Sequence, residues 1–230
     1  MAHSSYRQFC PVAMAAEILC RRWMMLVIRE LVAGTTRFND LRRGVPKMSR
    51  SLLATRLREL EDFGVIERHL LSHQSGVHEY RLTEAGRDLL PVVEAVGNWG
   101  QKWVESRLSL RNLDASLLMW DMHRNLDPAP LPNRRCLIQF CFPELPPRQQ
   151  NYWLVVEPSG DVELCRDDPG FELDLLVTTD LHSMTMIWMG LATVQELRER
   201  LDLSGDREIA ARMQTWLGLS PFAPTERRVS

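Results

Sequence analysis

The chain has 230 residues, of which 45% are hydrophobic and 25% charged, and its formal net charge at pH 7 is −2. This composition is typical of a soluble globular protein with one or two domains. No apolar run is long enough to cross a bilayer, and the first ten residues lack the basic-then-apolar order of a signal peptide. We therefore expect a cytoplasmic protein with no membrane partner.

Charge is divided unevenly along the chain. Residues 1–105 carry fifteen Lys or Arg against twelve Asp or Glu, whereas residues 106–230 carry thirteen against eighteen. A basic N-terminal part and an acidic C-terminal part suggest different partners. We predict one domain over 1–105 and a second over 106–230.

Two apolar segments at helical spacing begin the first domain, at 12–19 and 23–32, with a break at 20–22. Cys10 precedes Pro11 at the start of the first helix, where free N–H groups favour a thiolate. Cys10 is therefore a candidate redox sensor, and the alternative is a small packed residue. The five cysteines have no metal-ligand spacing, so we expect reduced thiols and no metal.

A short helix is predicted at 38–43, and a longer one lies within 46–64. Ser49 is suited to cap the longer helix, and Gly64 is suited to end it. A leucine stripe at helical period marks its buried face, formed by Leu53, Leu57 and Leu60. We expect that stripe to pack against apolar residues of the preceding helices: Leu19, Trp23, Leu26, Val27, Leu31, Phe38 and Leu41.

The other face of this longer helix is short, hydroxylated or basic. Between residues 37 and 58 there are seven Lys or Arg and one acid, Asp40. An ordinary amphipathic surface helix explains the long helix alone. Two helices joined by a short turn, the second one basic, are what a helix-turn-helix needs to enter the major groove of DNA.

Two short strands follow at 65–71 and 77–82, around a polar tip at 72–76, which together predict a winged helix. A long helix then runs from Thr83 to about Val104, and Pro91 should bend it or stiffen its first half. We interpret its apolar side as a homodimer contact rather than as a surface buried within one chain. The contact residues are Val92, Val96, Trp99 and Trp103.

The order and spacing of these features resemble the HxlR family of winged-helix transcription regulators. The matching residues span 10 to about 103: Cys10-Pro11, Arg22-Trp23, Arg29-Glu30-Leu31, Arg37-Phe38-Asn39-Asp40-Leu41, Leu57-Arg58-Glu59-Leu60-Glu61, Gly64-Val65-Ile66 and Glu79-Tyr80-Arg81-Leu82-Thr83-Glu84-Ala85-Gly86. The resemblance implies a homodimer with each recognition helix in a major groove. Cys20, Ser51 and Val77 depart from the family pattern, and Val77 replaces a basic residue of the wing.

From these features we predict that the partner is double-stranded operator DNA with an inverted repeat, and we assign the residues that contact it. Base-facing positions would be Arg50, Ser51, Thr55 and Arg56. Phosphate-facing or flanking positions would be Arg37, Arg42, Arg43, Lys47 and Arg58. Ser49 at the cap and His73 and Gln74 at the wing tip complete the predicted set.

The second domain is predicted to be α+β. Helices are expected at 117–126, 181–190, 194–200 and 206–217, and strands at 136–142, 152–157, 162–166, 173–178 and 201–203. The order resembles the sterol-carrier-protein-like domain, chiefly in Thr178-Thr179-Asp180-Leu181, Gly190 and Leu201-Asp202-Leu203-Ser204-Gly205-Asp206.

That resemblance implies an apolar tunnel, which Met184, Trp188 and Met189 could line for a small apolar effector. The alternative is that these side chains fill a core. The motifs of hydrolases, P-loop proteins, zinc proteases and dinucleotide-binding proteins are missing from the sequence, so we expect no enzyme and no cofactor. The prediction is a dimeric DNA-binding regulator, and the alternative is a lipid carrier whose winged helix binds proteins.

Overall fold

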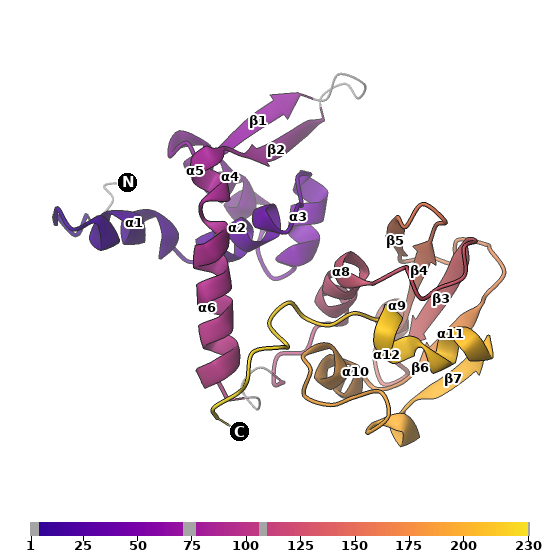
Figure 1. Ribbon diagram of the computed structural model, residues 1–230. Helices are drawn as coiled ribbons and strands as arrows, with labels where there is room; N and C mark the ends of the chain where they lie inside the picture. Colours follow the sequence, from indigo (N-terminus) through magenta and orange to yellow (C-terminus); the bar gives the residue numbers. More distant parts are fainter. Residues whose placement is uncertain (1–4, 71–76, 106–109, 230) are drawn as a thin grey trace. The chain divides into compact units, whose positions relative to one another are not determined.

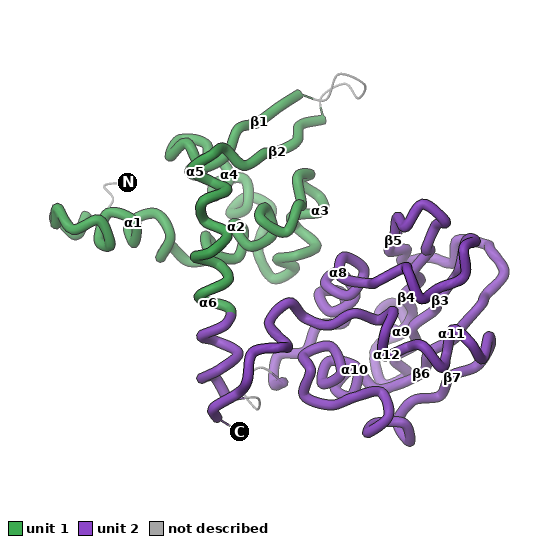
Figure 2. The backbone as a smooth tube through the Cα atoms, viewed as in Figure 1, with its two compact units in different colours: residues 1–97 green, residues 98–230 purple. Residues whose placement is uncertain are grey.

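The computed structural model describes residues 5–70, 77–105 and 110–229 (Figure 1). It separates into two compact units, Met1–Gly97 and Asn98–Ser230 (Figure 2). The boundary falls inside helix α6, Leu90–Trp103, a few residues before the boundary predicted at 105. No helix among the described residues is long and apolar enough to cross a membrane.

The first unit starts with four helices, of which the last three bury apolar residues in one core, while the first buries none and only packs its partly buried Leu19 against that core. They are α1 Pro11–Leu19, α2 Met24–Val32, α3 Phe38–Gly44 and α4 Arg50–Asp62. The predicted break between α1 and α2 is confirmed, and Trp23 there has a left-handed φ of 76°. The leucine stripe of α4 is buried as predicted, whereas Leu26 is 40% exposed because it lies on the outer side of α2.

The wing is an antiparallel pair, β1 Ile66–Leu70 and β2 His78–Leu82, with Ile66 opposite Leu82. The Tyr80 N–H donates to the Thr36 carbonyl at 2.8 Å, which ties the wing to the segment before α3. Both strands were predicted from sequence. The predicted contacts His73 and Gln74 lie outside the described residues.

The long helix predicted after Thr83 is two helices, α5 Glu84–Arg87 and α6 Leu90–Trp103. Thr83 caps only α5, where its hydroxyl oxygen accepts the Gly86 N–H at 3.2 Å. Pro91 lies in the first turn of α6, where its missing N–H has no intrahelical partner to lose. The chain therefore breaks at residues 88–89 instead of bending at Pro91.

The second unit is built on a five-stranded mixed sheet of order β5-β4-β3-β6-β7. Its strands are β3 Cys136–Cys141, β4 Asn151–Val156, β5 Val162–Cys165, β6 Leu175–Thr178 and β7 Asp202–Gly205. Strand β3 pairs parallel with β6, and the other neighbours are antiparallel. This confirms an α+β unit with a sheet, close to the predicted strand positions.

The helices of this unit bury an apolar core against one face of the sheet. They are α8 Ala115–Asn125, α10 Leu181–Trp188, α11 Arg207–Ala211 and α12 Met213–Trp216, whereas α9 Pro147–Gln150 and the 3-10 turn η1 Arg198–Arg200 contribute no buried residue. The helix predicted at 194–200 is wrong, since only η1 forms there. The helix predicted at 206–217 is split at Arg212.

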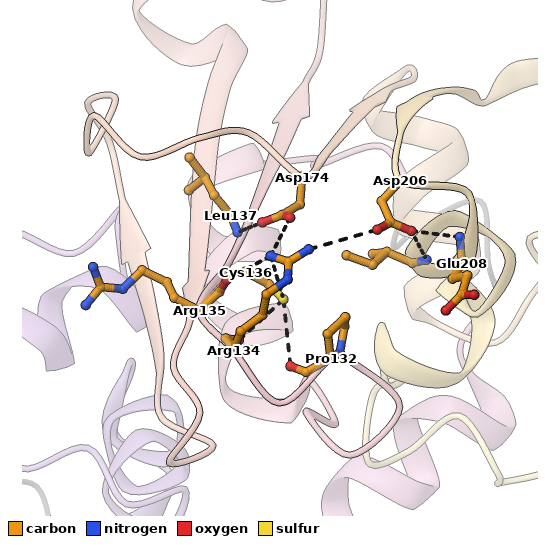
Figure 3. A network of polar contacts seen from close by, with 9 residues as sticks. Pro132, Arg134, Arg135, Cys136, Leu137, Asp174, Asp206 and Glu208 are labelled. Carbon is orange, nitrogen blue, oxygen red and sulfur yellow. Dashed lines mark hydrogen bonds and ion pairs between the residues drawn. The ribbon is translucent and has the colours of Figure 1, made fainter.

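A polar network fastens the end of the sheet near β3, β6 and β7 (Figure 3). Arg134 pairs with Asp174 at 2.6 Å, and the other carboxylate oxygen of Asp174 accepts the Leu137 N–H at 2.8 Å. The pKa of Arg134 is raised by its hydrogen bond and charge attraction to Asp174. Asp206 lies 4.0 Å from Arg134 and caps α11, so one cluster joins three strands to a helix.

Candidate nucleic-acid interface

Helix α4 is positioned by its cap and by its buried leucines. The Ser49 hydroxyl oxygen accepts the Leu52 N–H at 3.3 Å, which satisfies one of the free donors of the first turn. Leu53, Leu57 and Leu60 are at most 1% exposed, so one face of the helix is fixed in the core. The opposite face is left to solvent.

A buried ion pair sets the approach of α2 to the end of α3. Glu30 is fully buried, and its carboxylate accepts the Arg29 guanidinium at 2.6 Å. Arg29 also donates to the Gly44 carbonyl at 2.8 Å. A Cβ on Gly44 would collide with the Glu30 carboxylate, so this packing requires glycine. The pair therefore fixes the turn that leads from α3 into α4.

The solvent side of α4 brings together most of the predicted contacts. Arg50 and Ser51 are exposed at the start of the helix, Lys47 is exposed just before it, and Arg58 lies further along. The half-buried Thr55 donates its hydroxyl to the Ser51 carbonyl at 3.0 Å. Among the described residues, Lys47 and Arg50 have no acidic partner within ion-pair distance. This start of α4 can therefore meet phosphates and base edges without first breaking an ion pair.

Three further cations predicted to contact DNA precede α4 in the sequence. Arg37 is exposed as the N-cap residue of α3, and Arg42 is half-buried in its last turn. Arg43 is 53% exposed and pairs loosely with Asp40 at 3.5 Å.

Arg56 is placed differently from the other predicted base contacts. Its guanidinium donates to the Arg22 carbonyl at 3.0 Å and to the Glu59 carboxylate at 2.7 Å, and its side chain is only 16% exposed. Arg21 also pairs with Glu59, at 3.3 Å. These contacts hold α4 against the turn between α1 and α2, so Arg56 is already occupied in the free chain.

The wing presents two cations that lie outside the predicted set of DNA contacts. Arg68 is exposed on β1 opposite Tyr80, and Arg81 is exposed on β2 opposite Glu67. Arg81 pairs with Glu79, whereas among the described residues Arg68 has no ion pair. Burial raises the pKa of Tyr80, and the positive charge of Arg68 opposes that rise. Strand alternation places Arg68 and Tyr80 on one face and could have identified them.

The profile of the HxlR-like helix-turn-helix family matches residues 18–108. The chain is 32% identical over 99 residues to YvaP of Bacillus subtilis strain 168, an uncharacterized HTH-type transcriptional regulator, and the match covers 43% of this chain and 92% of YvaP. The chain belongs to the HxlR-like family. Another relative, YdeP of the same strain, is 38% identical over 94 residues, which are 41% of this chain and 73% of YdeP.

Among solved structures, the redox regulator HypR in its reduced form is 34% identical to the chain. The match covers 40% of this chain and 91% of HypR, with a TM-score of 0.38. The relatives support the prediction of an HxlR-type transcription regulator over that of a lipid carrier.

Two further features of this HxlR-type chain bear on assembly. The side of α6 assigned to a dimer contact is exposed: Val92 is 37%, Val96 51%, Trp99 62% and Trp103 49% accessible. Helix α1 has no buried residue, and Phe9 and Val12 beside Cys10 are 98% and 76% exposed. Cys10 is also exposed, at the N-cap position of α1.

The C-terminal unit of this HxlR-type chain contains a recess of about 170 Å³ between α8 and α10. Of the three residues predicted to hold an effector, Trp188 and Met189 line it, and Met184 is fully buried in the core. The remaining lining residues are Asn112, Leu113, Asp114, Leu117, Leu118, Asp121 and Thr185. Five of the nine lining residues are therefore apolar and four are polar.

Proposed function

We propose that the protein binds operator DNA as a homodimer and regulates transcription. The observation that carries this proposal is the solvent face of α4, where Arg50, Ser51 and the flanking Lys47 are exposed above a helix locked by three buried leucines. Exposed cations supply phosphate attraction, and the hydroxyl and guanidinium groups can reach base edges in the major groove.

The dimer part of the proposal is supported by the exposed apolar stripe on α6. Each chain carries one recognition helix, and a two-fold dimer presents two of them to an inverted repeat. Half-sites should then lie about 10 base pairs apart centre to centre, or at a multiple of that spacing. On the DNA-binding face of α4, the remaining predicted contacts would act as flanking groups. They are Arg37, Arg42, Arg43, Arg58, Ser49 and Thr55.

Footprinting on genomic fragments selected by the purified protein tests this proposal. Two protected half-sites with the predicted spacing are expected, and affinity should fall steeply as salt rises. Protection of a single unrepeated half-site by a monomer would contradict the dimer. We compare 50 and 200 mM salt because phosphate contacts are screened over that range. A DNA affinity that stays the same between these two concentrations would contradict binding by the basic face.

A second part of the proposal is a small apolar effector in the C-terminal recess. Trp188 and Met189 supply its apolar wall, which favours a ligand over a fully packed core at this point. Its volume is similar to that of cavities of about 150 Å³ that hold benzene. We therefore expect a compound with one aromatic ring rather than a sterol, even though the unit's element order resembles a sterol-carrier-like domain.

Fluorescence and calorimetry of the full chain with indole, benzoate and a sterol test the effector site. Binding of indole or benzoate that weakens when Thr185 is replaced by Trp, which would fill the recess, supports it. Binding of none of the three probes would remove the effector and leave the C-terminal unit as an assembly module. A cytoplasmic location and the absence of enzyme activity remain part of the same proposal.

A further inference from the structure

The second half of α6 has no apolar core of its own. Val93 is the one residue of α6 that is buried, and it belongs to the first unit. Asn98 to Trp103 belong to the second unit, yet both tryptophans there are exposed. Hydrophobic burial therefore does not fix this end of the helix, and polar contacts are the alternative.

The C-terminal segment 220–228, which we name the strap, hydrogen-bonds to this end of α6. Figure 2 shows its backbone in the second unit. The Thr225 hydroxyl donates to the Asn98 side-chain oxygen at 2.7 Å, and the Arg228 N–H donates to the Lys102 carbonyl at 2.9 Å. Arg227 donates to the Gln101 side-chain oxygen at 3.3 Å and to the Val104 carbonyl at 2.6 Å. A guanidinium at a helix C-terminus also meets the negative end of the helix dipole.

The other end of the strap is fixed to the end of α10. The Ser220 N–H donates to the Trp188 carbonyl at 2.8 Å. Gly190 has a left-handed φ of 69°, and a Cβ there would stand 2.8 Å from the Cβ of Ala223. Gln101 closes the connection, since its amide nitrogen donates to the Met189 carbonyl at 3.4 Å. The strap is thus anchored on a packed helix before it reaches α6.

The strap contacts the side of α6 away from the apolar stripe. At about 100° per residue, Asn98 and Gln101 project more than about 120° away from the mean direction of Val92, Val96, Trp99 and Trp103. The strap therefore contacts α6 on the side opposite the apolar stripe and leaves the stripe exposed. A rotation or fraying of the last turns would move Trp99 and Trp103 out of line with Val92 and Val96.

We propose that the strap, with Arg227 at its centre, positions the dimer stripe of α6. Arg227 is a positioning residue: it is not one of the predicted DNA contacts, and it acts through the orientation of the two tryptophans. This inference rests on the proposed dimeric DNA binding. It adds that residues at the far C-terminus of the chain set how well two N-terminal units pair.

The test compares Arg227→Ala with Arg228→Ala in the full chain. Arg228 is a matched control because, among the described residues, its side chain pairs only with the exposed Glu226 at 3.4 Å, and its backbone contact survives the substitution. Arg227→Ala should speed amide exchange at 98–104 and raise the dimer dissociation constant by about fivefold or more. Arg228→Ala should change neither quantity.

DNA measurements separate a positioning role from a general loss of stability. Arg227→Ala should weaken binding to a paired operator and leave binding to a single half-site unchanged, with the melting temperature within a degree or two of wild type. If Arg227→Ala lowers the melting temperature strongly, Gln101→Leu serves as the second variant, because it removes the acceptor for Arg227 on α6.

Equal exchange and equal dimerisation in the two arginine variants would overturn the inference. If wild type binds no DNA, the proposed function fails, but exchange at 98–104 and the dimer constant still decide the role of the strap.

Discussion

Gly44 lies so close to Glu30 that a methyl group on its Cα would overlap the buried carboxylate. The close approach lets Arg29 reach both the Glu30 carboxylate and the Gly44 carbonyl. Gly44→Ala must push α3 away from α2 or expel the Glu30 side chain from its pair. We expect the free energy of unfolding to fall by about 1–3 kcal/mol or more, as in other overpacked cores.

Urea unfolding of Gly44→Ala measures that loss, with Asn39→Ala as the control. Asn39 is exposed on the same short helix, and its substitution should change stability by less than about 0.5 kcal/mol. A Gly44→Ala protein as stable as Asn39→Ala would show that α3 can shift without cost.

Arg50 and Lys47 should differ in what they contribute to DNA binding. Arg50→Ala should cost about 1–3 kcal/mol and relax the preference for one base pair, because a guanidinium can hold a guanine by two hydrogen bonds. Lys47→Ala should weaken all DNA alike and reduce the salt slope by roughly one unit. Titrations on operator and scrambled DNA at several salt concentrations distinguish the two. If both variants lose as much affinity for scrambled DNA as for the operator, Arg50 contacts only phosphate.

Arg56 should act through stability. Its bonds to Glu59 and to the Arg22 carbonyl predict that Arg56→Ala lowers the free energy of unfolding by roughly 1–2 kcal/mol. Glu59→Ala should do the same, and the double variant should lose less than the sum, because the two residues share one contact. Base preference should remain that of wild type. A changed preference in Arg56→Ala would return this residue to the base-reading set.

Cys10 is tested by exposure to peroxide and to a quinone. If its exposed thiol at the start of α1 senses oxidants, Cys10→Ser should bind DNA as wild type does and ignore both reagents. Cys20→Ser, which removes the other exposed thiol, is the control and should still respond. Wild-type DNA affinity that neither reagent changes would remove the sensor hypothesis.

Asp180 predicts a specific loss of stability in acid. Burial raises its pKa, but hydrogen bonds from the Ser183 N–H and hydroxyl and the nearby Arg200 outweigh that effect, so its folded pKa is lowered. A carboxyl group with a lowered folded pKa contributes stability that is complete above its unfolded pKa of about 3.9 and is lost as pH falls through the folded value.

Asp180→Asn should therefore be less stable than wild type at neutral pH, and the difference should shrink as pH falls below about 4. Denaturant unfolding across that range measures the difference, with the exposed Asp167→Asn as control. A difference that does not depend on pH would show that capping geometry, and not charge, is what Asp180 provides.

Sequence predicted the regular elements of the first unit well, because local signals agree there. Ser49, the leucine stripe and Gly64 each mark the same helix, and the family resemblance covers the same segment. The breaks were harder to place. Pro91 suits both the interior of a bent helix and the first turn of a new one, and the local sequence does not decide between the two.

Side-chain partners over long sequence separations were out of reach of pattern analysis. Arg56 and Arg50 are both arginines on the same helix, and nothing local shows that the Arg22 carbonyl, 34 positions earlier, holds one of them. The strap contacts join residues 127 positions apart, so they depend on the tertiary fold. In the second unit, turn residues marked the strand ends, whereas the helix expected at 194–200 had only weak periodicity.

Helix α1 has nine residues and no buried side chain, and isolated helices shorter than about 12 residues are marginal in water. Val12 and Met14 within it and Phe9 just before it are exposed, and covering these apolar side chains by another surface would stabilise the helix. On dilution below the dimer constant this segment should melt while the rest of the unit stays folded. The far-ultraviolet circular dichroism per residue would then depend on protein concentration. The decrease in this helical signal on dilution would measure dimer dissociation without a label.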